Sequence, residues 1–490
     1  MRAVAVLYIL GWLLAAAALA MLIPAAVALA LDPIVVAQAF LVPALSTGFL
    51  GGCLIIAFMG RETLFGRRQS LLLLCGIWVV IPLAGALPLY TAGFPKSFIG
   101  AMFEAVSGFT TTGASIFVDL AEVPSSIIVW RGLLQWTGGL ATLLALAAIV
   151  APLTGAELME RQLRVIGRSA HGSALHVAES LRSILPLYSA LTMGCFLGLI
   201  FSGLPPFDAF CLSLSAVSTG GFMPREGTIE LYGAPAAELV LAVFMTLGCV
   251  SIIWLRAILQ ARWSIVRETR EPIWIFGIVA VAGVGLAVAL IRVSPESGLG
   301  DSLHSFTLAL ATMASLISTT GLAISDRTLE MIPYVALLGI CIVGGGRFST
   351  AGGLKLYRLG VMLRQLGREL RLLVYPHGVR PSRYGDEKQD IELLKMVWTV
   401  LVGFVLSIGV LAILLSAAGL PFEASLLAAA TALSNIGPAY DFARLSDLAD
   451  APSFADMSGW AQAVLCGGMI LGRVEILALF TLINLTYWRQ

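Results

Sequence analysis

The sequence predicts an all-α polytopic membrane protein, with ten transmembrane helices and four re-entrant pore helices in four parallel helix–pore–helix repeats around a central pore. Three observations predict this fold class. Hydrophobic residues make up 59% of the 490 residues and charged residues only 12%, whereas a water-soluble domain carries about 25% charged residues. Apolar segments of membrane-spanning length recur along the chain, and one short hydroxyl–glycine phrase occurs four times.

Ten segments are long and apolar enough to cross a bilayer, whose core of about 30 Å requires roughly 20 apolar residues per helix. The first lacks a clear cleavage site, so we expect it to remain as a helix rather than to be removed as a signal peptide. The expected spans are 4–30, 34–59, 70–91, 126–152, 182–203, 236–258, 273–293, 331–360, 396–418 and 459–486.

Shorter apolar stretches of about a dozen residues lie between the two spans of each of the last four pairs. They are too short to cross the bilayer, and we interpret them as pore helices, because irregular backbone at membrane depth must be surrounded by protein or a water-filled cavity. The predicted organisation is a leading helix pair over 1–60 and four pore repeats over 61–152, 153–263, 264–370 and 371–490.

Each of these stretches ends in a phrase in which small polar residues lead to a glycine. Glycine adopts backbone angles that other residues avoid, so successive carbonyls can point toward one axis and replace the water shell of a cation. The leading hypothesis is therefore a potassium pore. The expected filter residues are Thr111, Thr112, Gly113, Ser218, Thr219, Gly220, Thr319, Thr320, Gly321, Asn435, Ile436 and Gly437.

The alternative for these residues is ordinary packing, because glycines and hydroxyls are common where membrane helices approach closely. The filter glycines are spaced 107, 101 and 116 residues apart (220−113, 321−220 and 437−321), and this regular recurrence favours the filter. In the fourth copy Asn435-Ile436 replaces the hydroxyl pair, so we expect an asymmetric ring.

Lysine and arginine concentrate on alternate loops of the predicted topology. By the positive-inside rule, both termini lie in the cytoplasm and the filter loops open to the outside. The chain is expected in the inner, cytoplasmic membrane of a bacterium.

Several motifs together resemble the TrkH/KtrB superfamily of potassium transporters, and the leading helix pair resembles its TrkH branch. The likeness extends over nearly the whole chain, in segments 103–114, 135–139, 218–222, 349–355 and 472–475. The resemblance implies potassium uptake, a homodimer in which each subunit has its own pore, and gating by a cytoplasmic TrkA-type nucleotide-binding ring.

Two arginines at membrane depth, Arg347 and Arg473, indicate a gate. A charge at the bilayer centre is costly and usually faces a cavity or a partner. Glu475 does not share a helix face with Arg473, so we expect Arg473 to point toward the pore. Glycines break the eighth span opposite it, and in the family such a loop and arginine obstruct the path below the filter. The expected gate is Gly344, Gly345, Gly346, Arg347 and Arg473.

The remaining polar residues have simpler interpretations. Glu104 is expected to complement the amino terminus of the first pore helix, with a direct ion-binding role as the alternative. The histidines (171, 176, 304 and 377) are expected in solvated loops. Four aspartates of an outer loop (441, 447, 450 and 456) either enrich cations or keep the loop soluble.

No enzyme signature is present, because residues 346–355 lack the spacing of a phosphate-binding loop. We therefore expect no cofactor in this chain, with the potassium ion as substrate. The basic cytoplasmic stretches 153–182 and 361–395 are long enough to dock a partner. Two other function classes remain open, a potassium carrier coupled to proton or sodium movement and a membrane scaffold or receptor.

Overall fold

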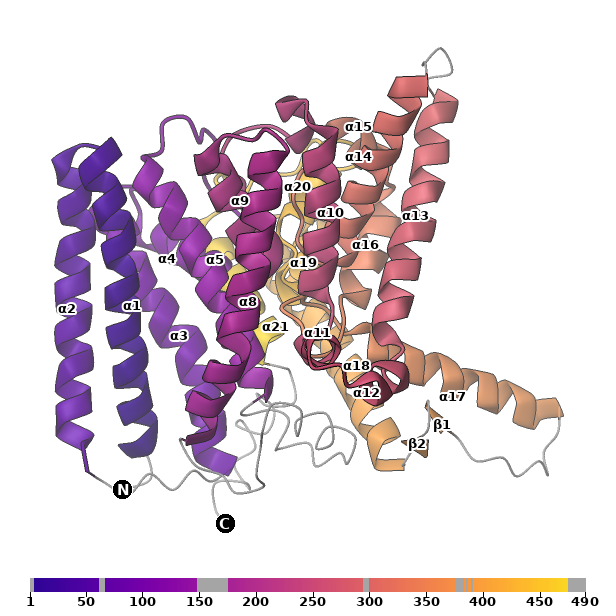
Figure 1. Ribbon diagram of the computed structural model, residues 1–490, viewed down its shortest axis with the longest axis horizontal. Helices are drawn as coiled ribbons and strands as arrows, with labels where there is room; N and C mark the ends of the chain where they lie inside the picture. The colour runs from indigo at the N-terminus through magenta and orange to yellow at the C-terminus, as the bar shows by residue number, and fades with distance from the viewer. Residues whose placement is uncertain are drawn as a thin grey trace.

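The computed structural model describes residues 4–60, 67–147, 175–293, 299–374, 383–384, 387–388 and 391–474. Within these ranges the fold is all-α, apart from an antiparallel pair of two-residue strands, β1 (Arg383–Tyr384) and β2 (Glu387–Lys388). Most of the long helices run from the upper to the lower face of the molecule in Figure 1, as expected for a polytopic membrane protein.

The leading helix pair is a hairpin of α1 (Val4–Leu31) and α2 (Ile34–Phe58) at one edge of the molecule (Figure 1). The two helices touch at glycines: a Cβ atom on Gly51 would lie 2.8 Å from the Gly11 carbonyl oxygen. On the outer side of α2, Phe49 is 75% exposed. Such an apolar surface is suited to lipid rather than water.

The first two repeats have the expected order of helix, pore helix and helix. Their long helices bracket short pore helices that begin near the upper face (Figure 1). The first repeat contains α3 (Arg67–Thr91), α4 (Phe98–Phe109) and α5 (Ser125–Ala145). The second contains α8 (Leu175–Phe201), α9 (Pro206–Ser218), the short 3-10 helix η3 (Ile229–Tyr232) and α10 (Pro235–Cys249).

The last two repeats carry additional short helices. The third contains α13 (Glu271–Val293), α14 (Leu299–Ile317), α15 (Asp326–Glu330), α16 (Tyr334–Val343) and α17 (Leu356–Val374). The fourth contains α18 (Ile391–Ala417), α19 (Phe422–Ser434), α20 (Pro438–Arg444) and α21 (Gly459–Val474). The third pore helix, α14, has 19 residues rather than the expected dozen, because it continues upward alongside α13.

The prediction of one continuous span over 236–258 is wrong. The chain bends by 102° between α10 and α11 (Ile252–Leu259), and α12 (Trp263–Glu268) follows at the lower face. A loop from the third repeat takes the backbone groups freed at the bend. The Cys249 carbonyl accepts a hydrogen bond from the Gly346 amide at 3.0 Å, and the Ile252 amide donates to the Phe348 carbonyl at 3.1 Å.

The prediction of one span over 331–360 is also wrong. Helix α16 ends at Val343, residues 344–355 form an irregular loop, and α17 projects sideways from the lower part of the molecule (Figure 1). Glycine ends α16, because Gly344 has a φ of +67°, which side chains disfavour. The tenth expected span is described as far as Val474, and its remainder lies outside the described residues.

Among the described helices, seven are long and apolar enough to cross a membrane, or eight if the bent pair of α10 and α11 is counted as one broken span. The seven are α1, α2, α3, α5, α8, α13 and α18. The pore helices occupy the interior instead: in α19, every residue from Leu427 to Ser434 is buried. The core therefore lies where the pore helices converge.

Asp32, in the turn between α1 and α2, caps a helix of the first repeat. Its carboxylate oxygens accept the Ser125 amide at 3.0 Å and the Ser126 amide at 2.9 Å, at the start of α5. The first amides of a helix have no partner within the helix, and a carboxylate there also complements the helix dipole. The cap joins the leading helix pair to the pore repeats.

We expect Asp32→Ala to lower the free energy of unfolding by about 1 kcal/mol, because loss of a capping side chain costs about 0.5–2 kcal/mol. Thermal unfolding of the detergent-purified protein measures the effect. Asp32→Asn keeps one acceptor and should lose less, while Asp450→Ala, at an exposed position, is the control. A midpoint equal to wild type for Asp32→Ala would contradict the capping role.

Candidate functional site

Each pore helix is followed within two residues by a residue in the left-handed backbone region. Thr111 has a φ of +52°, Thr219 +54°, Thr319 +59° and Asn435 +54°. This region is uncommon for residues other than glycine and is an outlier for a β-branched residue. It costs on the order of 1–3 kcal/mol per residue. The four loops therefore turn in the same strained way at the same place.

A backbone hydrogen bond that follows each turn shows which residues of the four loops correspond to one another. The next amide always donates to a carbonyl five residues earlier: Thr112 to Ser107 (2.8 Å), Gly220 to Ser215 (2.8 Å), Thr320 to Ser315 (2.9 Å) and Ile436 to Thr431 (3.0 Å). Gly220 therefore corresponds to Thr112, so its predicted equivalence with Gly113 is wrong by one residue, and Gly221 takes that place. The Gly220-Gly221 pair left two choices, which alignment of Ser218 with Thr110, Ser318 and Ser434 would have resolved.

The four loops form a closed ring, because each filter glycine lies against the following loop. A Cβ atom added to Gly113 would meet the Gly220 carbonyl oxygen, and one added to Gly221 would meet the Thr320 carbonyl oxygen. A Cβ atom on Gly321 would meet the Pro438 ring, and one on Gly437 would meet Ala114. The last contact returns to the first loop. The expected filter residues thus surround one axis, with Gly221 added to them.

The fourth loop differs from the others, as its sequence predicts. Gly437 has a φ of −53° and starts α20 instead of adopting a positive φ. Its amide donates to the Thr112 carbonyl at 2.7 Å. The Asn435 amide group donates to the Thr112 hydroxyl at 2.9 Å and to the Met469 carbonyl at 3.0 Å. The ring is therefore asymmetric in its backbone and in its side chains.

Glu104 does not cap the first pore helix, and that prediction is corrected. Ser97 does so, accepting the Gly100 amide at 3.0 Å. Glu104 lies seven residues into α4 and is fully buried. Its carboxylate pairs with Arg131 at 3.2 Å and accepts the Ile116 amide at 2.6 Å. It therefore braces the segment that leaves the first filter loop.

The loop of residues 344–355, which we call the gating loop after the role expected of it, lies directly against the expected filter loops. The Thr350 and Thr219 hydroxyls are 3.1 Å apart, and the Gly352 amide donates to the Thr319 hydroxyl at 2.8 Å. A Cβ atom on Gly352 would meet the Ser434 carbonyl oxygen. The gating loop therefore touches the second, third and fourth filter loops.

Arg473 joins the gating loop to the first filter loop. It is 7% exposed, and it donates to the Thr110 carbonyl at 2.5 Å and to the Thr350 carbonyl at 2.6 Å. Its remaining terminal nitrogen donates to the Thr111 hydroxyl. The planar guanidinium, with several donors in a fixed arrangement, suits such a three-way bridge.

Arg347 lies in the gating loop and has contacts different from those of Arg473. It is half-buried, its guanidinium lies 3.5 Å from the centre of the Tyr357 ring, and its amide donates to Glu271 at 3.1 Å. The expected gate residues therefore separate: Arg473 contacts the filter, while Arg347 anchors the gating loop to its surroundings.

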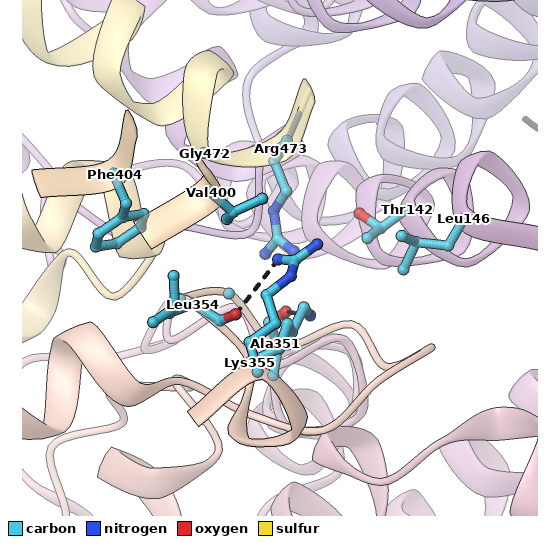
Figure 2. A pocket seen from close by; sticks show the side chains of 12 residues that line it. Thr142, Leu146, Ala351, Leu354, Lys355, Val400, Phe404, Gly472 and Arg473 are labelled. Carbon is cyan, nitrogen blue, oxygen red and sulfur yellow. Dashed lines mark hydrogen bonds between the residues drawn. The ribbon is translucent and has the colours of Figure 1, made fainter. Parts of the chain in front are cut away.

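A small pocket of about 40 Å³ adjoins Arg473 and the gating loop. Figure 2 shows Arg473 extending from α21 toward the segment that carries Ala351 and Leu354. Three cationic side chains line the pocket, those of Lys355, Arg358 and Arg473. A potassium ion entering it would be repelled, the more strongly where water is excluded.

Sequence reasoning missed Thr350, Lys355 and Arg358 as parts of this site. Thr350 and Lys355 belong to the glycine-containing segment that carries part of the family resemblance, and no role was predicted for their side chains. Arg358 falls within the expected span 331–360 and lies at the first turn of α17, and no role was predicted for it.

The histidines and aspartates that were expected in loops lie in several different surroundings. His304 lies in α14, 3.0 Å from buried Glu238, so its assignment to a solvated loop is wrong, while His176 falls within α8. Asp447 accepts the Tyr334 amide at 2.8 Å, and Asp441 lies 3.6 Å from Arg444. His171, His377 and Glu475 lie outside the described residues.

Comparison with known proteins identifies related chains. The model of the family TrkH, described as a cation transport protein, matches residues 47–281 and 297–486. The Trk system potassium uptake protein TrkI of Halomonas elongata is 29% identical over 418 residues, 84% of this chain and 82% of that protein. The Trk system potassium uptake protein TrkH of Vibrio parahaemolyticus is 29% identical over 504 residues, 99% of both chains.

Solved structures agree with these relatives. The crystal structure of the potassium transporter TrkH from Vibrio parahaemolyticus has a TM-score of 0.87 and 27% sequence identity to this chain, and the match covers 100% of both chains.

We expect Gly113→Ser to lower the preference for potassium over sodium by about tenfold. The added side chain would press on the Gly220 carbonyl oxygen, and overpacking costs roughly 1–3 kcal/mol where a tenfold change is about 1.4 kcal/mol. Uptake of both ions by cells that lack their own potassium transporters measures the effect.

Gly203→Ser is the matched control, because Gly203 also has a positive φ but has no atom within 4 Å of an added Cβ. It should leave discrimination unchanged. If Gly113→Ser and Gly203→Ser discriminate alike, Gly113 is not a filter residue.

Proposed function

Because the chain belongs to the TrkH family of cation transport proteins, we propose that it takes up potassium across the bacterial inner membrane through the four-loop ring. The single observation that carries this proposal is the closed ring itself, in which a glycine of each of the four loops lies against the next loop. Ring-like sets of backbone carbonyls can replace the hydration shell of a potassium ion. The relatives described above carry potassium in their names.

The pore helices support a cation as the permeating species. Their carboxyl ends all lead into the filter loops. Each such end carries about half a negative charge. Four of them around one axis favour a cation and disfavour an anion.

The gating loop and Arg473 form the gate in this proposal. Together they contact all four filter loops, three through the gating loop and the first through Arg473. Backbone in this position obstructs the axis, and the guanidinium repels a cation below the filter. Conduction then requires both to move away.

A potassium carrier coupled to proton or sodium movement is the alternative mechanism. Parallel repeats around a ring favour a conduction path, whereas many secondary transporters combine inverted repeats around broken helices. Single-channel recording in a planar bilayer separates the two. For a pore, the reversal potential follows the potassium gradient and does not respond to an imposed proton gradient.

The proposed assembly is a homodimer regulated by a cytoplasmic TrkA-type nucleotide-binding ring. With both termini in the cytoplasm, the lower face in Figure 1 meets that ring. This face includes α11 and α12, which carry Arg256 and Arg267, and α17, which projects from it. Residues 153–174 of one proposed docking stretch lie outside the described residues.

We expect Arg473→Ala to raise potassium flux by about tenfold or more without changing selectivity. Removing the guanidinium removes its repulsion of a cation below the filter, while the filter glycines stay in place. Flux through purified protein in liposomes measures the change.

Arg327→Ala is the control, because Arg327 is 78% exposed on the opposite side of the filter. It should conduct as wild type does. Flux no higher than wild type, in Arg473→Ala protein that elutes as a single species of normal size, would remove Arg473 from the gate.

A further inference from the structure

We propose that the strained filter threonines Thr111, Thr219 and Thr319 have a second role as latches that hold the closed gating loop against the filter. The inference rests on the proposed function, because it takes residues 344–355 and Arg473 to be the gate. It assigns to the filter side chains a role that the backbone carbonyls do not have.

Each of the three threonine hydroxyls reaches the gate directly. The Thr219 hydroxyl lies 3.1 Å from that of Thr350, and the Thr319 hydroxyl accepts the Gly352 amide at 2.8 Å. The Thr111 hydroxyl accepts a hydrogen bond from Arg473. All three residues are fully buried, so these bonds form away from bulk water.

The neighbouring filter hydroxyls bond to other filter groups. Thr110 and Thr112 share a hydrogen bond of 2.7 Å, Thr112 also accepts the Asn435 amide group at 2.9 Å, and Ser318 and Thr320 share a bond of 2.6 Å. The Thr219 hydroxyl donates to the Ser218 carbonyl at 2.7 Å in addition to its contact with Thr350. Ser218 donates to the Leu214 carbonyl at 2.7 Å. Contact with the gate is therefore a property of the left-handed position and not of filter hydroxyls in general.

The residue types at the four left-handed positions fit this division. Asparagine tolerates left-handed backbone better than a β-branched residue does. It occurs in the fourth loop, where its amide group binds Thr112 and Met469. Threonine, the less favourable choice, occurs in the three loops whose side chain binds the gate. Backbone strain of this kind persists where the surrounding structure over-determines it.

Opening must therefore break the three latch contacts, and the released hydroxyls face the vacated space below the filter. The closed state gains these bonds and the open state loses them, so each latch shifts the equilibrium toward closure. The same residues adopt the left-handed conformation at which each filter loop turns. The latches thereby link the backbone conformation of the filter loops to the position of the gate.

The test is single-channel recording of the full-length Thr219→Val and Thr319→Val proteins in planar bilayers. Valine keeps the β-branched shape and removes the hydroxyl. We expect the open-to-closed ratio to rise by about two- to tenfold in each, as for loss of one hydrogen bond. Thr219→Ser and Thr319→Ser keep the hydroxyl and should raise the ratio less than the valine variants do.

Thr312→Val is the matched control. Thr312 is buried on α14, the pore helix that leads to Thr319, and its hydroxyl pairs with Thr328 at 2.7 Å, away from the gate. It should leave the open-to-closed ratio unchanged. A rise in this variant as large as in Thr319→Val would overturn the latch, because buried hydroxyls in general would then affect gating.

A double-mutant cycle tests the Thr219–Thr350 contact itself. If the two hydroxyls stabilise the closed state through each other, Thr219→Val combined with Thr350→Val opens the pore less than the product of the two single effects. Independent effects would overturn the latch at this position.

The gate and the latch can fail separately. Valine variants that gate as wild type does, beside an Arg473→Ala protein with raised flux, overturn the latch and keep the gate. An Arg473→Ala protein without raised flux overturns the proposed gate itself.

Discussion

One constraint shapes the centre of this protein: irregular backbone at membrane depth must find hydrogen-bond partners inside the protein, because the lipid offers none. The filter loops and the gating loop are both irregular, and they satisfy one another. The Gly437 amide donates a hydrogen bond to the Thr112 carbonyl, and the Gly352 amide donates one to the Thr319 hydroxyl. The bend between α10 and α11 meets the same requirement. The gating loop donates a hydrogen bond to the Cys249 carbonyl and accepts one from the Ile252 amide, two groups that the interrupted helix leaves unpaired.

Buried charge is treated differently on the two sides of the filter. Behind the first loop, Arg131 is paired with the carboxylate of Glu104 and lies 4.0 Å from the centre of the Phe222 ring. At the gate, the three hydrogen bonds described for Arg473 go to two carbonyls and one hydroxyl. Neutral acceptors hold the guanidinium in place without cancelling its charge. The first arrangement suits a rigid brace, and the second suits an electrostatic barrier.

The sequence predicts what depends on local composition. Long apolar runs predicted the spans of α1, α2, α3, α5, α8, α13 and α18, and the repeated phrase predicted the four loops that meet in the ring. Aligning the phrase on its glycine left Gly220 and Gly221 as two choices, and aligning it on the preceding Ser218 was needed to choose between them. The bend after Cys249 was missed for another reason: its partners, Gly346 and Phe348, belong to the next repeat. The roles of Thr350 and Arg358 likewise come from contacts distant in the chain.

The bend has a mechanical consequence. The gating loop is hydrogen-bonded to the helices on both sides of the bend. The Ile252 amide, at the first turn of α11, donates to the Phe348 carbonyl, and the Cys249 carbonyl, at the end of α10, accepts from the Gly346 amide. α11 cannot tilt relative to α10 without stretching one of these two bonds or carrying the loop along. A movement of α11 at the lower face would therefore displace residues 346–348 of the gating loop directly. Such a displacement does not require a long helix to move along the membrane normal.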